Sequence, residues 1–109
     1  MFEPRSDPAL HYRLLKKLAQ HPDASQRQIA SDLGVSLGKV NYCLKALIRK
    51  GVIKVHNFST SDNKRAYAYY LTPEGLRFKA EVTRQWFRRV EQEYEELRRE
   101  MARMGADGE

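Results

Sequence analysis

The C-terminal third of the chain carries an apolar pattern that repeats every seven residues. Leucine, valine, aromatic and methionine side chains recur there with alternating spacings of four and three. This spacing is typical of the seam of a coiled coil. A helix of about 30 residues extends about 45 Å, beyond the reach of one small domain, and its apolar stripe therefore needs a partner. The repeat comprises Leu76, Ala80, Thr83, Phe87, Val90, Tyr94, Leu97, Met101 and Met104.

The outer part of this repeat is predicted to hold a homodimer together. Its first turns, near Leu76 and Phe78, are close enough to fold back on their own domain, whereas from Val90 onward a second subunit is expected to cover the stripe. The direction of the paired helices stays open, because a contact of Glu93 with Arg98 in a parallel pair is weak evidence. The predicted dimer contacts are Phe87, Val90, Tyr94, Leu97 and Met101.

Three short amphipathic helices are predicted before this segment, the first over residues 9–20. Ser25 begins the second, and Gly34 ends it because glycine accepts the left-handed conformation of a helix C-terminus. Ser36 caps the third, which ends at Gly51. Two helices joined by a three-residue turn form a helix-turn-helix.

Two strands with a polar tip follow, over residues 52–58 and 65–71, and then Thr72 and Pro73 begin the long helix. The predicted fold class is mainly α (α+β), a winged helix-turn-helix domain with a long C-terminal coiled-coil helix. The domains are a flexible N-terminal arm (1–8), a winged helix-turn-helix DNA-binding domain (9–75), a dimerisation helix (76–104) and a tail (105–109).

The positive charge is concentrated in the first part of the chain. The formal net charge is +6. Residues 1–79 hold 14 Lys and Arg against 6 Asp and Glu, whereas residues 80–109 hold 6 against 8. A basic surface favours polyanions such as nucleic acid.

The outward face of the third helix, 36–50, has the chemistry to read the major groove of DNA. Its small, basic and amide side chains suit close approach, phosphate contact and adenine pairing, with Arg49 as a further phosphate contact. The wing, 57–66, is predicted to follow the backbone or minor groove. The predicted DNA contacts are Ser36, Gly38, Lys39, Asn41, Tyr42, Lys45, Lys64 and Arg65.

These residues resemble the MarR family of bacterial regulators over about residues 10–80. The run SLGKVNYCLKALIRKGVI (36–53) is similar to the family's recognition helix, and DNKRAYAYYLTPEG (62–75) resembles its wing and L-T-x-x-G element. The run SLGKVNYCLKALI followed by LTPEG is most similar to the short subgroup associated with exopolysaccharide gene clusters.

The resemblance implies a dimeric regulator, often a repressor, that binds a palindromic site. It implies that Asp62 steadies the wing loop and that Arg65 reaches the groove. Tyr42 departs from the family, since many members have arginine there. Typical members also wrap further terminal helices around a ligand pocket. Because only a short arm precedes the first helix here, a small-molecule effector is not expected.

Other chemistries find little support in the sequence. His11, His21 and His56 have no partner at metal-ligand spacing, and we expect them to be surface or half-buried residues. Cys43 is expected to be a small core residue. We therefore predict no metal, no cofactor, no enzyme activity and no membrane contact, and a cytoplasmic protein. Two alternatives remain, a protein–protein adaptor and an RNA-binding protein.

Overall fold

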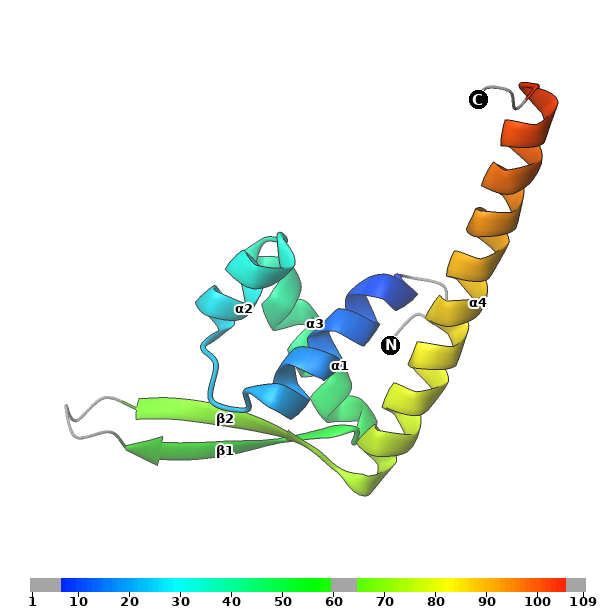
Figure 1. The fold of residues 1–109 in the computed structure, drawn as a ribbon. Coiled ribbons are helices and arrows are strands. Elements are labelled where there is room, and N and C mark those ends of the chain that lie inside the picture. The colour runs from blue at the N-terminus through cyan, green and yellow to red at the C-terminus, as the bar shows by residue number, and fades with distance from the viewer. Residues whose placement is uncertain (1–6, 60–64, 106–109) are drawn as a thin grey trace.

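Three short helices, a two-stranded ribbon and one long helix make up the structure (Figure 1). The computed structural model describes residues 7–59 and 65–105. The elements follow the predicted order, which confirms the fold class of a winged helix-turn-helix with a long C-terminal helix. They are α1 (Pro8–Gln20), α2 (Gln26–Leu33), α3 (Leu37–Lys50), β1 (Ile53–Ser59), β2 (Arg65–Leu71) and α4 (Pro73–Arg103).

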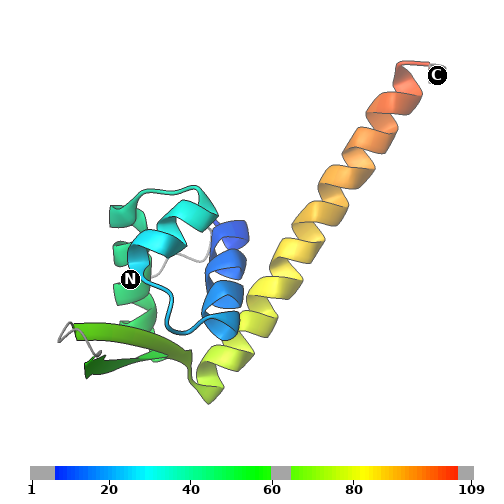
Figure 2. The same ribbon diagram turned by 60° about the vertical axis from the view of Figure 1, so that its left-hand side comes forward.

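The core lies where α1, α2 and α3 meet, and Figure 2 shows these three helices grouped apart from the outer half of α4. Each helix contributes aliphatic residues spaced three or four apart, which places them on one face. Full burial of such a side chain stabilises the fold by about 1.5–3 kcal/mol. The most deeply buried large side chains are Leu14, Leu15, Leu18, Ile29, Leu44 and Leu47.

The turn between α2 and α3 forms as the sequence predicts. Gly34 adopts the left-handed conformation, with φ of 71°, and Ser36 caps α3 by accepting a hydrogen bond from the Lys39 N–H at 3.0 Å. Ser25 caps α2 in the same way. These local devices turn the chain sharply and leave the N-terminus of α3 at the surface.

Helix α1 begins at Pro8, one residue before the predicted start. Asp7 caps it, since its carboxylate accepts a hydrogen bond from the Leu10 N–H at 3.2 Å. Proline fits the first helical position because the backbone N–H that it lacks has no helical partner there. Pro8, which we expected in the arm, is therefore a buried part of the helix.

Strands β1 and β2 form an antiparallel ribbon whose register runs from Ile53 opposite Leu71 to Ser59 opposite Arg65. The Tyr69 N–H donates to the Pro22 carbonyl at 2.8 Å, which ties β2 to the loop between α1 and α2. The base of the ribbon is therefore fixed to the helical core, while the opposite end extends away from it (Figure 1).

Helix α4 packs on α1 with its first turns and then leaves the domain (Figures 1 and 2). Phe78 packs against the core, as expected, and Val82 is buried as well. Leu76 does not, being 61% exposed, because it lies on the apolar seam rather than on the face toward α1. Among the helices of the described ranges, none is long and apolar enough to span a bilayer.

Candidate nucleic-acid interface

The outward face of α3 carries most of the side chains predicted to contact DNA. Val40, Leu44 and Leu47 turn inward to the core. The opposite side faces solvent and carries basic side chains, the small residues Ser36 and Gly38, and one aromatic ring, Tyr42, which is 58% exposed. The exposed residues predicted to contact DNA are Ser36, Gly38, Lys39, Tyr42, Lys45 and Arg49.

Asn41 differs from the other predicted contacts because it is half-buried and hydrogen-bonded within the protein. Its Nδ2 donates to Oε1 of Gln26 on α2 at 3.2 Å, and Nε2 of Gln26 donates to the Tyr69 hydroxyl on β2 at 3.0 Å. An amide group has two N–H bonds and one oxygen, and the contact with Gln26 uses one N–H. The bonded series Asn41–Gln26–Tyr69, which we call the amide bridge, joins α3, α2 and β2.

The amide bridge contains two residues that the sequence did not single out for function. Gln26 follows the predicted helix cap Ser25, and Tyr69 lies within the predicted second strand. No local pattern connects positions 26, 41 and 69. The bridge forms only because the fold brings α2, α3 and β2 together, and it links the orientation of Asn41 to β2 of the wing.

The wing residues are only partly within the described ranges. Asp62 and Lys64, predicted as the loop-steadying residue and a DNA contact, lie outside the described residues. Arg65 is the first residue of β2 and pairs with Ser59. Of the predicted DNA contacts on the wing, Arg65 therefore lies within the described residues and Lys64 lies outside them.

His11 and Cys43 are buried beneath the outward face of α3. Burial lowers the pKa of the His11 imidazole; Asp7 opposes this shift, and Lys39 adds to it. Burial also raises the pKa of the Cys43 thiol. The charge of Lys39 lowers this pKa and partly offsets the effect of burial, whereas the charge of Asp7 raises it further. The core position predicted for Cys43 is confirmed. The expectation of a surface or half-buried His11 is wrong, since it is 4% exposed, because its helical position faces inward with the leucines of α1.

The predicted dimer contacts lie on the outer part of α4, where every residue from Phe87 to Gly105 is exposed. Phe87, Val90, Tyr94, Leu97 and Met101 are 41–64% exposed. An apolar hollow on this side is lined by Tyr94, Leu97, Arg98, Met101 and Ala102.

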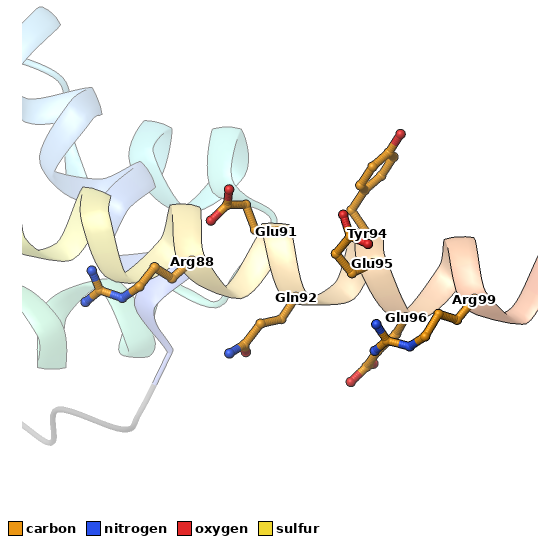
Figure 3. Close-up of a pocket in the computed structure, with 7 residues that line it drawn as sticks. All are labelled: Arg88, Glu91, Gln92, Tyr94, Glu95, Glu96 and Arg99. Atoms are coloured by element: carbon orange, nitrogen blue, oxygen red, sulfur yellow. The ribbon is translucent and has the colours of Figure 1, made fainter.

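Figure 3 shows a second hollow of α4, bordered by charged and amide side chains together with Tyr94. All of its lining residues belong to α4, and none of them supplies a nucleophile paired with a base. Among the described residues, no group of three or more His, Cys, Asp and Glu side chains is placed to hold a metal ion.

The helix-turn-helix, its capped recognition helix and the antiparallel ribbon together define a winged helix-turn-helix protein. Residues 8–54 match the family described as winged helix-turn-helix DNA-binding. No curated protein sequence matches the chain.

Solved structures of transcriptional regulators share this fold. A PadR-like regulator from Bacillus cereus has a TM-score of 0.69 at 18% identity, covering 81% of this chain and 90% of that one. A MarR/EmrR family regulator from Acinetobacter sp. ADP1 has a TM-score of 0.59 at 27% identity, covering 77% and 58%. FabT of Streptococcus pneumoniae, solved in complex with DNA, has a TM-score of 0.55 at 25% identity, covering 77% and 57%.

The predicted resemblance to MarR regulators is confirmed, and PadR-like regulators are similar to the chain as well. The family match over residues 8–54 and the MarR/EmrR structure point to a DNA-binding regulator and not to an enzyme. The resemblance to the exopolysaccharide-associated subgroup stays a prediction.

Proposed function

We propose that this protein is a sequence-specific, double-stranded DNA-binding transcriptional repressor that acts as a homodimer in the bacterial cytoplasm. The observation that carries the proposal is the outward face of α3, where Lys39, Lys45 and Arg49 are exposed at the surface of a helix-turn-helix. In such proteins the second helix of the motif enters the major groove.

Each part of the interface has a separate task in this proposal. Residues 36–50 lie in the major groove, where Gly38 permits close approach and Asn41 pairs with adenine. Lys39 and Lys45 contact phosphates and set the position of the helix, but carry no direct sequence information. The wing, 57–66, with Lys64, Arg65 and the loop-steadying Asp62, follows the backbone or enters the minor groove.

The homodimer supplies the second half of a palindromic site. Two copies related by a two-fold axis present two recognition helices, and the half-sites then lie about one helical turn, or a multiple of it, apart. The exposed seam of α4 supports this arrangement because its apolar side chains project away from their own domain.

Selection of bound fragments from random duplex DNA, followed by titration at rising salt, tests the proposal. With about 6–10 phosphate contacts per dimer, log K falls by about 0.9 per contact for each unit of log salt. Lys45→Ala should lower this slope by about 1 per subunit. Arg99→Ala, which removes a similar charge from α4, should not change it.

Other outcomes of the same experiment would contradict the proposal. A protein that does not bind duplex DNA at physiological salt is the adaptor that the sequence left open. A preference for RNA over duplex DNA identifies the RNA-binding alternative. Equal affinity for selected and scrambled duplexes would refute sequence-specific recognition.

A further inference from the structure

We propose that the α4 helices of two copies pair antiparallel, with the two-fold axis crossing between Arg88 and Arg89. The inference rests on the homodimer proposed above and adds its direction and register. In this register four pairs of seam residues repeat on both sides of the axis. They are Leu76 with the partner's Met101, Ala80 with the partner's Leu97, Thr83 with the partner's Tyr94, and Phe87 with the partner's Val90.

The position of the winged domain on α4 leaves room for a partner helix along this whole length. The domain covers the side of α4 that carries Gly75 and Val82. Leu76 and Ala80 lie on an adjacent side and stay exposed. Apart from the half-buried Thr83, the seam is therefore exposed from its first residue. The apolar hollow at Leu97 and Met101 is placed to receive the partner's Leu76 and Ala80.

Side-chain size favours the antiparallel register over a parallel one. Coiled-coil layers pack well when large residues face small ones. The antiparallel register places Ala80 against leucine, Thr83 against tyrosine and Phe87 against valine. A parallel pair in register would instead place alanine against alanine in one layer and phenylalanine against phenylalanine in another, leaving a gap beside a crowded contact.

Charges beside the seam favour the same register. The antiparallel register brings Lys79 next to the partner's Glu100 and Arg84 next to the partner's Glu91. These two attractive contacts outnumber one repulsive contact, that of Arg77 with the partner's Arg98. Charges at these flanking positions set the orientation of paired helices. A parallel pair would place Lys79 beside the partner's Arg84, which is repulsive, and Glu93 beside the partner's Arg98, which is attractive. Its charged contacts therefore cancel, whereas those of the antiparallel register are attractive in sum.

The neighbouring antiparallel register, with its axis at Gln92, has unfavourable flanking charges. It would bring Glu91 beside the partner's Glu91 and Arg84 beside the partner's Arg98. It would also leave Leu76 without a seam partner. Of the parallel pair and the two antiparallel registers compared, side-chain size and charge therefore both favour the antiparallel register with its axis between Arg88 and Arg89.

Disulfide trapping between two single-cysteine variants tests the direction and register. Ala80→Cys and Leu97→Cys are each made in a chain whose buried Cys43 is changed to Ser, or to Ala if the serine variant does not fold. We expect a covalent dimer when the two variants are mixed, refolded together and oxidised, and little from either alone. A disulfide needs Cα atoms within about 7 Å. Mixing Phe87→Cys with Leu97→Cys, which are paired only in the register centred at Gln92, is the matched control.

Sedimentation of the unmodified protein distinguishes a failure of the proposed homodimer from a failure of the proposed helix direction and register. A monomeric protein refutes the homodimer itself. A dimer in which Ala80→Cys and Leu97→Cys each trap with themselves overturns the antiparallel direction. A dimer that traps only the control pair, or no pair, overturns the register.

A charge exchange gives an independent readout that needs no cysteine. Arg84→Glu should weaken dimerisation by about tenfold, since it turns two symmetric attractions into repulsions. Adding Glu91→Arg should restore it, even though the contact of Arg84 with Glu81 within the helix stays lost. Tighter dimerisation of Arg84→Glu alone would instead support a parallel pair.

Discussion

At the surface of α3, the side chain of Asn41 is held in place by its neighbours, whereas Lys39, Tyr42 and Lys45 extend into solvent. A side chain that reads a base loses less conformational freedom on binding if the protein already restricts it. The bond to Gln26 leaves the amide with one N–H, which can donate to adenine N7, and with its oxygen, which can accept from the adenine N6–H. The amide bridge is therefore compatible with base reading by Asn41.

Asn41→Ala should cost about 1–3 kcal/mol of binding free energy on the true operator and little on random DNA. Lys45→Ala should instead weaken binding to both duplexes by similar factors, because phosphate contacts do not depend on sequence. Titration of each variant against operator and scrambled duplex measures the difference. An equal loss on both duplexes for Asn41→Ala would mean that another face of α3 lies in the groove.

The stability of the folded chain should fall when the pH drops below about 6.5, the ordinary pKa of histidine. Burial keeps the pKa of His11 below that value. Between the two pKa values the unfolded chain binds a proton that the folded chain does not, and the free energy of unfolding therefore decreases as the pH falls through this window. Urea unfolding at neutral and mildly acidic pH measures the effect.

His11→Gln should reduce this pH dependence because glutamine has no proton to gain. His21→Gln is the matched control, since His21 is exposed at the end of α1. If the unfolding free energy of the His11 variant declined with acid as steeply as that of the unmodified chain, another group would be responsible.

At the scale of elements, the junction between β2 and α4 explains the L-T-x-x-G element. The Thr72 hydroxyl donates to the Gly51 carbonyl at 2.7 Å and accepts from the Gly75 N–H at 2.9 Å. Gly75 lies against the backbone of Val52, and a Cβ at this position would stand 1.9 Å from the Val52 carbonyl oxygen. The glycine lets α4 begin directly on the start of the wing.

Gly75→Ala should therefore destabilise the fold by about 3 kcal/mol or more, because backbone must move to admit the methyl group. The same substitution at Gly38 should have the opposite sign. A Cβ there meets only the Ser36 hydroxyl, at 4.0 Å, and alanine favours a helix by about 1 kcal/mol. Urea unfolding of both variants tests this pair, and a loss of stability at Gly38 equal to that at Gly75 would contradict it.

Gly38→Ala should nevertheless weaken DNA binding if α3 approaches the duplex closely at that position. A variant that is more stable and binds less tightly separates the role of Gly38 in the interface from any role in folding. Unchanged affinity would place the closest approach elsewhere on α3.

Sequence reasoning succeeded for these elements where short-range chemistry decides the structure. The caps at Ser25 and Ser36 and the glycine ends at Gly34 and Gly51 involve residues within one turn of each other, and all four lie where the pattern predicts. The amide bridge and the burial of His11 could not be foreseen, because they depend on which helices meet. The exposure of Leu76 depends similarly on the angle at which α4 leaves the domain.

At the scale of the whole molecule, the elongated shape is the main consequence of α4. The structure measures 63 × 27 × 22 Å, with a radius of gyration of 17.9 Å. A compact domain of about 100 residues has a radius of about 13 Å. The excess length is a helix with an exposed apolar stripe, an arrangement that costs free energy in water unless a second chain covers it.

Changing Val90 and Leu97 together to Asp should yield a monomer. Burying either apolar side chain contributes about 1.5–3 kcal/mol, and a carboxylate in the same layer adds a desolvation cost. The winged domain should stay folded, because both residues are exposed and lie beyond Val82, which is buried against the domain. Sedimentation gives the mass, and circular dichroism checks the fold.

The monomer should bind a palindromic operator on the order of 100-fold or more less tightly, because two linked half-sites no longer act together. Its affinity for a single half-site should be close to that of one subunit of the dimer, since α3 and the wing are unchanged. Gln92→Asp adds a carboxylate on the polar side of α4 (Figure 3) and should leave both mass and affinity unchanged. A double variant that stays dimeric would show that the seam is not the dimer contact. A monomer that kept full operator affinity would show instead that dimerisation plays no part in DNA binding.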